Sequence, residues 1–316
     1  MAVRLLFGRR PWLLSFVGAA LVFLAAIALA QGRGTGGMAT AAASLAVFIV
    51  VVGIGQMFVI TLGPGNVDLS LPANIGLASA VAMKVMDGQD ALIPLGLIAA
   101  LGCGLAIGAA NYLLIAALRI PPIIATLSTS FIVQSIDISY GRGLQIKPPP
   151  GFADFTDLRL LGVPGYALVV LLVSVLAAIV LHRTAYGRAV KAIGQNMRAA
   201  WLAGIKVGRI RCATYMLCGA LGALNGALLA GYFRGASVDL GSEYLLASIA
   251  VVVIGGTAVG GGSSNVLGLW GGAFFLVLLQ IMLNTYGVDA GLRLILTGVV
   301  IIAVITAGGG RRLDRT

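Results

Sequence analysis

The chain has 316 residues, of which 59% are hydrophobic and 10% are charged, whereas soluble domains usually carry about 25% charged residues. This composition and a mean hydropathy of +1.05 exclude a sizeable soluble domain. The net charge of +11 does not indicate a nucleic-acid partner, because the basic residues lie in short segments between apolar runs, as they do in membrane proteins.

Apolar runs that are long enough to cross about 30 Å of hydrocarbon recur along the whole sequence. They predict an all-α polytopic membrane protein with about ten transmembrane helices, organised as a single membrane domain over residues 1–316. The third, fifth and eighth runs are short, so we expect broken or re-entrant segments among them. The predicted spans are Trp12–Ala30, Met38–Ile60, Pro72–Met86, Leu92–Leu118, Pro122–Tyr140, Gly165–His182, Cys212–Phe233, Leu245–Val259, Leu267–Asn284 and Leu292–Ala307.

The first span follows a basic amino-terminal region and ends at Ala28-Leu29-Ala30, which resembles the cleavage site of a signal peptide. The apolar core of a signal peptide usually has about 7–15 residues. The run from Trp12 to Ala30 is longer than that and is long enough to cross a membrane, so we expect an uncleaved helix.

Lysine and arginine residues determine the predicted orientation. With the amino terminus inside, the ten spans place most of the 21 basic residues on the inner side, and the opposite orientation would place the same residues outside. We therefore expect a cytoplasmic amino-terminal segment over residues 1–11, a cytoplasmic coupling segment over 183–211 and a cytoplasmic tail over 308–316. The longest outer segment, 141–164, contains consecutive prolines and is expected to be an irregular loop.

A break rich in glycine and proline, Gly63 to Pro72, follows the second span, and a helix cannot continue through it. Asp68 lies in this break, where its carboxylate is expected to cap the next helix by accepting hydrogen bonds from free N–H groups. Contact with a solute is the alternative role, and capping does not exclude it. The other intramembrane charges lie near outer helix ends, where we expect Lys84 to be partly paired with Asp87 and Asp137 to reach water.

The sequence predicts no catalytic site and no metal site. A P-loop requires a lysine after a glycine, and no lysine of this chain follows a glycine, so we expect it neither to bind nor to hydrolyse ATP by itself. His182 is the single histidine, and it ends a span at the inner side, where a cation is mildly favoured. Cys103, Cys212 and Cys218 lack the spacing of metal ligands and are expected to be small packing residues.

The inner segment contains a short predicted helix between Asn196, a favourable N-cap, and Gly204, a favourable residue after a helix C-terminus. Met197, Ala200 and Trp201 share one face of this helix at i, i+3 and i+4. A helix this short is marginal alone in water and gains order by docking on another surface. It is either a membrane-surface helix, favoured by the basic residues nearby, or a docking helix for a cytoplasmic partner.

Three patterns follow one another between about Gly53 and Ile305. The first is Gly65-Asn66-Val67-Asp68-Leu69-Ser70; the second runs from Gly187-Arg188 through Ala192-Ile193-Gly194, Asn196 and Ala199-Ala200 to Gly204-Ile205; the third is Gly255-Gly256-Thr257, in a turn expected to connect closely packed helices. With these patterns, the chain resembles the permease subunits of the ribose/xylose/arabinose-type ABC sugar importers.

This resemblance implies a permease that passes a small polar solute, foremost a monosaccharide, through a bacterial inner membrane by alternating access. It implies a cytoplasmic ABC ATPase that binds ATP, a periplasmic solute-binding protein and a second permease copy, identical or a paralogue, within the lipid. One alternative is the related family of branched-chain amino acid ABC permeases. The other is a stand-alone secondary carrier or channel, which would explain the spans but not the inner helix.

Two groups of residues are assigned on this basis. The residues expected to couple the chain to the ATPase are Gly187, Arg188, Gly194, Asn196, Met197, Ala199, Ala200, Trp201 and Gly204. Sparse polar residues are expected to line the path, because a transporter must bind its solute weakly enough to release it. Alternatively, single Asn and Gln side chains link helices by hydrogen bonds. The path residues are Gln56, Asn66, Asp68, Ser70, Asn111, Gln134, Asn225 and Gln280.

Overall fold

The computed structural model describes residues 12–29, 35–141, 147–160 and 163–309. The predicted cytoplasmic segment 1–11 and most of the predicted tail 308–316 lie outside the described residues. Almost all regular structure is helical, which confirms the all-α fold. Two short strands, β1 (Arg159–Leu160) and β2 (Val163–Pro164), form an antiparallel pair.

Each predicted span corresponds to a helix, although the boundaries differ by a few residues. These helices are α2 (Leu13–Leu29), α3 (Thr35–Thr61), α4 (Leu71–Met86), α5 (Ile93–Leu118), α6 (Pro122–Gly141), α8 (Gly165–Arg183), α11 (Val207–Tyr232), α12 (Tyr244–Ile254), α13 (Val266–Thr285) and α14 (Ala290–Gly309). The remaining described helices are η1 (Asp90–Leu92), α7 (Pro150–Asp157), α9 (Ala185–Gln195), α10 (Met197–Leu202) and η2 (Val238–Gly241).

Within the described residues, 6 helices are long and apolar enough to cross a membrane alone: α3, α5 together with η1, α6, α8, α11 and α13. The fifth predicted span, which we expected to be short, is one of them, because α6 has 20 residues. The third and eighth are shorter, since α4 has 16 residues and α12 has 11. At about 1.5 Å per residue, α12 reaches through roughly half of the hydrocarbon thickness, so it does not cross a membrane alone.

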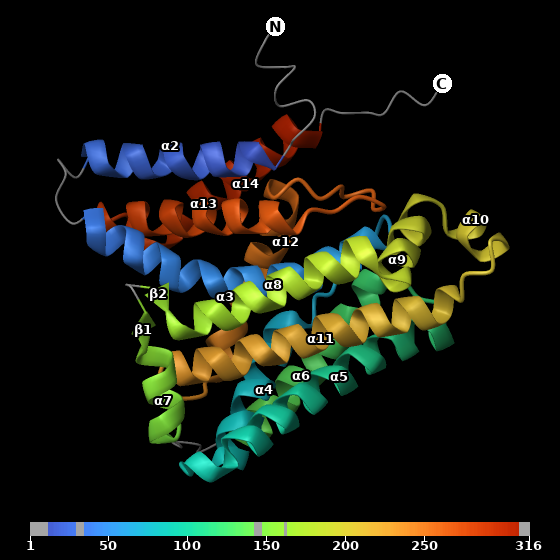
Figure 1. Ribbon diagram of the computed structural model, residues 1–316, viewed down its shortest axis with the longest axis horizontal. Helices are drawn as coiled ribbons and strands as arrows, with labels where there is room; N and C mark the ends of the chain where they lie inside the picture. Colours follow the sequence, from blue (N-terminus) through green and yellow to red (C-terminus); the bar gives the residue numbers. More distant parts are fainter. Residues whose placement is uncertain (1–11, 30–34, 142–146, 161–162, 310–316) are drawn as a thin grey trace, which may run out of the picture.

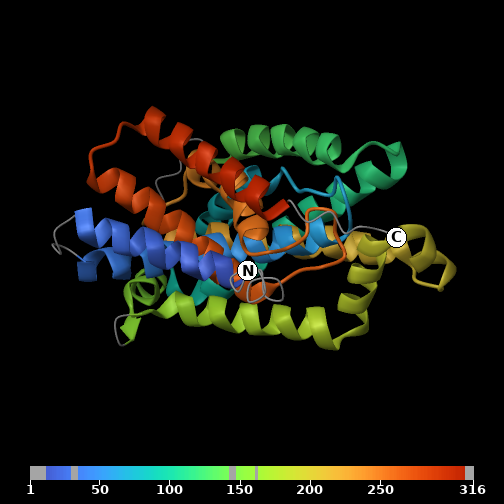
Figure 2. The same ribbon diagram turned by 90° about the horizontal axis from the view of Figure 1, so that it is seen from above.

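The long helices lie side by side along the longest dimension of the molecule (Figure 1). α11 packs against α3, α4 and α5, and α3 also packs against α12 and α13, while α2 covers α13. Seen from above, α6 and α8 lie on opposite sides of the bundle (Figure 2). α9 and α10 project at one end, and α7 with the strand pair lies at the other end (Figure 1).

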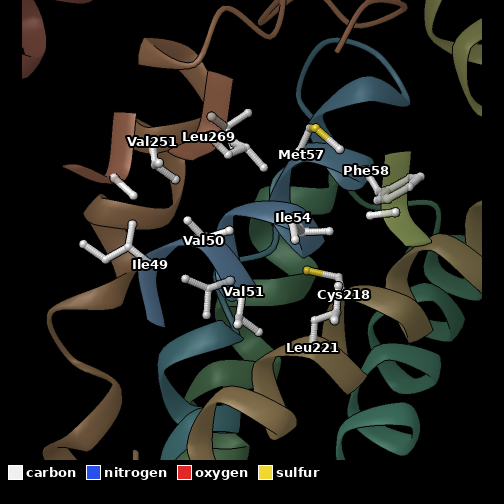
Figure 3. Packing of buried hydrophobic residues seen from close by; sticks show 14 of the residues in the cluster. Ile49, Val50, Val51, Ile54, Met57, Phe58, Cys218, Leu221, Val251 and Leu269 are labelled. Atoms are coloured by element: carbon white, nitrogen blue, oxygen red, sulfur yellow. The ribbon is translucent and has the colours of Figure 1, made fainter. Parts of the chain in front are cut away.

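α3 is central because its sequence is apolar on every side, as is typical of a helix surrounded by protein. Figure 3 shows how its side chains meet those of three other helices. The labelled buried residues are Ile49, Val50, Val51, Ile54, Met57 and Phe58 from α3, Cys218 and Leu221 from α11, Val251 from α12 and Leu269 from α13. Cys218 is therefore a packing residue, as predicted.

Glycines let α5 and α11 approach each other closely. A Cβ atom on Gly104 would collide with the carbonyl oxygen of Gly219, and a Cβ atom on Gly219 would collide with that of Gly104. No side chain fits at either position, so small residues determine the separation of this helix pair.

The segment 141–164, which we predicted to be an irregular loop, contains α7 and the strand pair instead. Pro150 stands at the first position of α7, where its missing N–H is no loss. The Gly151 N–H donates to Asp90 Oδ1 at 2.8 Å, and Phe152 packs against Gly231 of α11. The prolines therefore begin a helix, and this helix is stabilised by packing on α11. The turn-forming residues alone do not indicate that contact.

Candidate functional site

The α9–α10 segment, residues 185–204, begins and ends at the residues that its sequence predicts. Thr184 caps α9, because its Oγ1 accepts the Gly187 N–H at 3.1 Å. Asn196 caps α10, because its Oδ1 accepts the Ala199 N–H at 3.0 Å. Gly204 follows the helix with a φ of +84°, in the left-handed region that favours glycine. Both predicted ends of α10 are confirmed.

Two glycines hold α9 against the membrane-length helices. A Cβ atom on Gly187 would collide with the Val180 carbonyl oxygen of α8, and one on Gly194 would collide with the Thr61 carbonyl oxygen at the end of α3. Gly262 donates its N–H to the same Thr61 carbonyl at 2.9 Å. The 255–264 turn is therefore a tight connection, as predicted, and it also meets α3 and α9 at one point.

α10 exposes an apolar face. Met197 is 42% exposed, Trp201 66% and Leu202 70%. Ala200, which we predicted on the face of Met197 and Trp201, is instead 4% exposed. The chain folds back after the helix, where the Ile205 N–H donates to the Ala200 carbonyl at 3.1 Å, and Ala200 belongs to the main buried cluster, against which Ile205 packs. Exposed apolar residues on a projecting helix are typical of a protein-docking surface.

Two shallow grooves lie beside Trp201. One has a volume of about 490 Å³ and is lined by Met197, Arg198, Trp201 and Val207. The other has a volume of about 440 Å³ and is lined by Trp201 and residues 204–209, which include Lys206 and Arg209. A partner that fits this surface needs an apolar centre and acidic groups around it.

The α9–α10 segment is also tied to α11. The hydroxyl groups of Tyr186 and Thr214 lie 2.8 Å apart, and burial raises the pKa of Tyr186 to about 12, so the phenol stays neutral in this hydrogen bond. Exposed Arg188 donates to the Arg183 carbonyl at 3.2 Å. Lys191 Nζ lies 3.1 Å from His182 Nδ1, and partial burial lowers the pKa of Lys191.

The break between α3 and α4 is folded by glycines and an asparagine. Gly63 and Gly65 have φ values of +120° and +79°, in the left-handed region. Asn66 Nδ2 donates to the Gly63 carbonyl at 3.1 Å. Asn66 Oδ1 accepts from the Tyr215 hydroxyl at 3.2 Å and from Arg211 Nη2 at 3.4 Å. Asn66 therefore attaches the break to α11.

A buried polar cluster, consisting of Gln56, Asn66, Asp68, Ser70 and Asn111, surrounds this break. Asp68 Oδ1 accepts from the Ser70 N–H at 2.9 Å, from the Ser70 hydroxyl at 2.6 Å and from Asn111 Nδ2 at 3.2 Å. Gln56 Oε1 accepts the Asp68 N–H at 3.3 Å, and Asn111 Nδ2 also donates to Ser70 Oγ at 2.8 Å. Five of the predicted path residues are thus brought together between α3, the break and α5.

The prediction that Asp68 caps α4 needs a correction. α4 begins at Leu71, and the carboxylate of Asp68 bonds the N–H of Ser70, the residue before the helix. The side chain of Ser70 makes no capping hydrogen bond to the helix. The carboxylate also accepts hydrogen bonds from the Ser70 hydroxyl and from Asn111. It therefore connects the residues that precede α4 to the neighbouring helix α5.

Three residues of this region were not predicted as site residues: Thr126, Arg211 and Tyr215. Thr126 Oγ1 accepts the Leu69 N–H at 3.1 Å, which attaches α6 to the break. Arg211 and Tyr215 are separated by four positions on α11, so they share a helix face. The sequence pattern that could have identified Arg211 and Tyr215 is a cation and a phenol four positions apart at the edge of an apolar run.

The other predicted path residues lie apart from the cluster. Gln134 is exposed on α6, and Gln280 is half-buried in α13. Asn225 is buried in α11, and neither its Nδ2 nor its Oδ1 has a hydrogen-bond partner among the described residues. The eight residues therefore do not form one continuous path within a single chain.

Two predictions about intramembrane charges were wrong. Asp137, expected to reach water, is 1% exposed, because Gly76 of α4 leaves room for its carboxylate; its Oδ2 has no hydrogen-bond partner among the described residues. Lys84, expected to be partly paired with Asp87, lies over the ring of Tyr140 at 4.0 Å from the centroid. The ion pair found among the described residues joins Arg234 and Asp157.

The fold defines the class: this is a multi-pass membrane protein with a projecting helical segment at one end. The family model described as the permease component of branched-chain amino acid transport systems matches residues 38–305, and the chain belongs to this family of ABC importer permeases. It is a non-catalytic transport subunit of the inner membrane, and membership of the family implies an ATPase and a solute-binding protein as partners.

Curated relatives support the sugar-importer branch. The chain is 35% identical to the ribose import permease protein RbsC of Bacillus subtilis (strain 168) over 259 residues, which cover 81% of this chain and 79% of the relative. It is 33% identical to RbsC of Escherichia coli (strain K12) over 263 residues, with 81% and 80% covered. It is 30% identical to the autoinducer 2 import system permease protein LsrD of the same strain over 264 residues, again with 81% and 80% covered. No solved structure matches the chain.

Proposed function

We propose that this chain forms the solute path of a bacterial ABC importer for a small polar solute of the monosaccharide class. A second permease copy, identical or a paralogue, completes the path, a cytoplasmic ATPase binds and hydrolyses ATP, and a periplasmic binding protein delivers the solute. The relatives named for ribose and autoinducer 2 import support a polar solute over a branched-chain amino acid.

In this proposal the end that carries α9 and α10 faces the cytoplasm. Support comes from the basic residues, which the positive-inside rule places on that side. Those in and beside the α9–α10 segment are Arg183, Arg188, Lys191, Arg198, Lys206, Arg209 and Arg211. Both termini face the cytoplasm as well.

The exposed apolar face of α10 carries the proposal. Met197, Trp201 and Leu202 project from a helix that is capped at both ends and held on the bundle by tight glycine contacts of α9. A surface helix in the lipid headgroups would not need these fixed contacts, whereas a helix that transmits the movement of an ATPase would. A stand-alone carrier has no use for such a docking face.

The path is proposed to run along the outward side of α6. Gln134, Ser128, Ser135 and Ser139 are exposed there, and a carboxamide that faces hydrocarbon leaves its polar atoms without partners. Water or a second permease copy satisfies them. In this arrangement the buried polar cluster around Asp68 shapes the α3–α4 break and does not contact the solute. Of the predicted path residues, Gln134 is the one that faces the solute.

Trp201→Asp tests the docking face. In membranes from cells that also produce the ATPase and the binding protein, this variant should insert normally but retain at most about a tenth of the ATPase on purification, because buried aromatic anchors contribute about 2 kcal/mol or more to a protein interface. Uptake of D-ribose, the probe solute, should fall with it. Arg198→Lys is the control. Ala200→Glu is less informative, because Ala200 is buried and its enlargement would disturb the segment itself.

Normal ATPase retention and normal D-ribose uptake by Trp201→Asp would show that α10 is not the docking helix. If the unaltered complex assembles and couples but does not take up D-ribose, the docking role stands and the proposed solute is wrong.

A further inference from the structure

The α9–α10 segment packs on α3 and α8 through the glycines of α9, and it is also joined to α11 at two places. α10 leads directly into α11 through residues 203–206, with the Ile205 N–H held by the Ala200 carbonyl. α9 is joined to the same part of α11 through the Tyr186–Thr214 hydrogen bond of 2.8 Å. A displacement of either helix is therefore passed to the first turns of α11.

Those first turns carry the two side chains that bind the break. Arg211 and Tyr215 lie on one face of α11, about one and two turns after its first residue, Val207. Both donate to the same atom, Asn66 Oδ1, at 3.4 and 3.2 Å. Tyr215 is fully buried, so its hydroxyl has no access to water.

The break that contains Asn66 is in turn connected to other parts of the bundle. Asn66 Nδ2 bonds the Gly63 carbonyl, and the next residues of the break are held by Gln56 of α3, Asn111 of α5 and Thr126 of α6. The break itself is not helical, and it contains Gly63 and Gly65, whose backbones have access to more conformations than those of other residues.

We propose that Arg211 and Tyr215 are positioning residues that couple the movement of the α9–α10 segment to the α3–α4 break through Asn66. The Asn66 carboxamide oxygen is the shared acceptor, and the loss of its donors weakens the attachment of the break to α11 while leaving both elements folded. This inference rests on the proposed function, because it requires the α9–α10 segment to be the docking site of the ATPase.

The chain offers a matched pair of variants. Tyr215→Phe removes the hydroxyl that binds Asn66, and Tyr166→Phe removes another buried hydroxyl, which joins α8 to the Ser44 carbonyl of α3 at 3.0 Å. Each change deletes one buried hydrogen bond between a helix and another segment of the bundle, so the cost in stability is similar. Only Tyr215 lies on the route from the α9–α10 segment, because Tyr166 lies at the opposite end of α8 from α9.

The experiment measures how ATP changes the accessibility of a cysteine on α6. Permease with a cysteine at Gln134, in a background without Cys103, Cys212 and Cys218, is reconstituted with its ATPase. A membrane-impermeant methanethiosulfonate reagent is the probe, and the ratio of labelling rates with and without ATP is recorded. Tyr215→Phe should reduce this ATP-dependent change about fivefold or more, the lower end of usual coupling between sites. Tyr166→Phe should leave it unchanged.

Arg211 provides a second measurement that does not alter a buried residue. Arg211→Met removes the donor to Asn66, whereas Arg211→Lys keeps a cation with N–H donors at this position. The proposal expects a reduced ATP response for Met and a largely restored response for Lys. An equal response of Tyr215→Phe and Tyr166→Phe, whether normal or reduced, overturns the positioning role. If the unaltered complex itself shows no ATP-dependent labelling, the proposed path along α6 fails instead.

Discussion

The outward faces of α6 and α8, which lie on opposite sides of the bundle, differ in composition (Figure 2). Between Leu168 and Ile179 of α8, every exposed residue is Leu, Val or Ile. On α6, exposed Ile and Leu residues are interrupted by Ser128, Gln134, Ser135 and Ser139.

This difference indicates different surroundings. Hydrocarbon satisfies an aliphatic face fully, but it leaves a carboxamide without hydrogen bonds. The serines are less costly, because a hydroxyl can bond its own helix, as Ser135 does with the Phe131 carbonyl at 2.9 Å. A groove of about 650 Å³ also lies on α6, lined by Ile132, Ser135, Ile136, Ser139 and Tyr140. We infer that α8 faces lipid and that α6 faces the path and the second permease copy.

The strongest test of this comparison places the same charge on each face. Leu172→Arg puts a cation near the middle of the lipid face of α8, where insertion typically costs about 2.5–3.5 kcal/mol, so the yield of inserted protein should fall sharply. Ser135→Arg should insert with a smaller loss but should block D-ribose uptake. Membrane yield and thermal unfolding of the purified variants are the measurements, and equal losses for the two variants would contradict the assignment of the faces.

Accessibility to water sharpens the comparison further. In the background without native cysteines, Gln134→Cys should react with a water-soluble methanethiosulfonate reagent at least about tenfold faster than Leu172→Cys, because the reactive thiolate forms in water and not in lipid. The rate is measured by mass shift of the purified protein. Equally slow labelling at the two positions would place α6 in lipid as well.

The smallest expected effect comes from a neutral change of Gln134, the side chain proposed to face the solute. Gln134→Leu should lower D-ribose uptake by roughly 2- to 12-fold, which corresponds to the loss of one hydrogen bond of about 0.5–1.5 kcal/mol, with assembly intact. Gln134→Asn should keep part of the activity. Leu172→Ala serves as the control on α8, where stability should stay within about 0.5 kcal/mol. Unchanged uptake by the Leu variant would remove Gln134 from the path.

Local features could be predicted from the sequence because they depend on neighbouring residues. The ends of α10 follow from Asn196 and Gly204, since a cap bonds N–H groups only two or three positions away. The spans follow from apolar runs of sufficient length. The break after α3 follows from the glycines and proline at its start, although Pro72 lies in the first turn of α4.

The sequence identified Gln56, Asp68 and Asn111 as candidate residues, but it did not indicate that they meet. They belong to α3, the break and α5, and their hydrogen bonds join positions up to 43 residues apart. Arg211 and Tyr215 were missed as site residues for the same reason, since their partner Asn66 lies on a distant segment.

By itself, then, the amino-acid sequence determined that this chain spans a membrane, where its spans lie to within a few residues, and which family it resembles, because hydropathy and capping act over short distances along the chain. Only the tertiary structure decided which side of each helix is covered. In the folded chain Ala200 and Asp137 are buried, Lys84 lies over the Tyr140 ring and not beside Asp87, and Gln134 is exposed. These outcomes depend on which helices pack together, and that choice is made by close contacts such as those of Gly104 with Gly219 and Gly76 with Asp137.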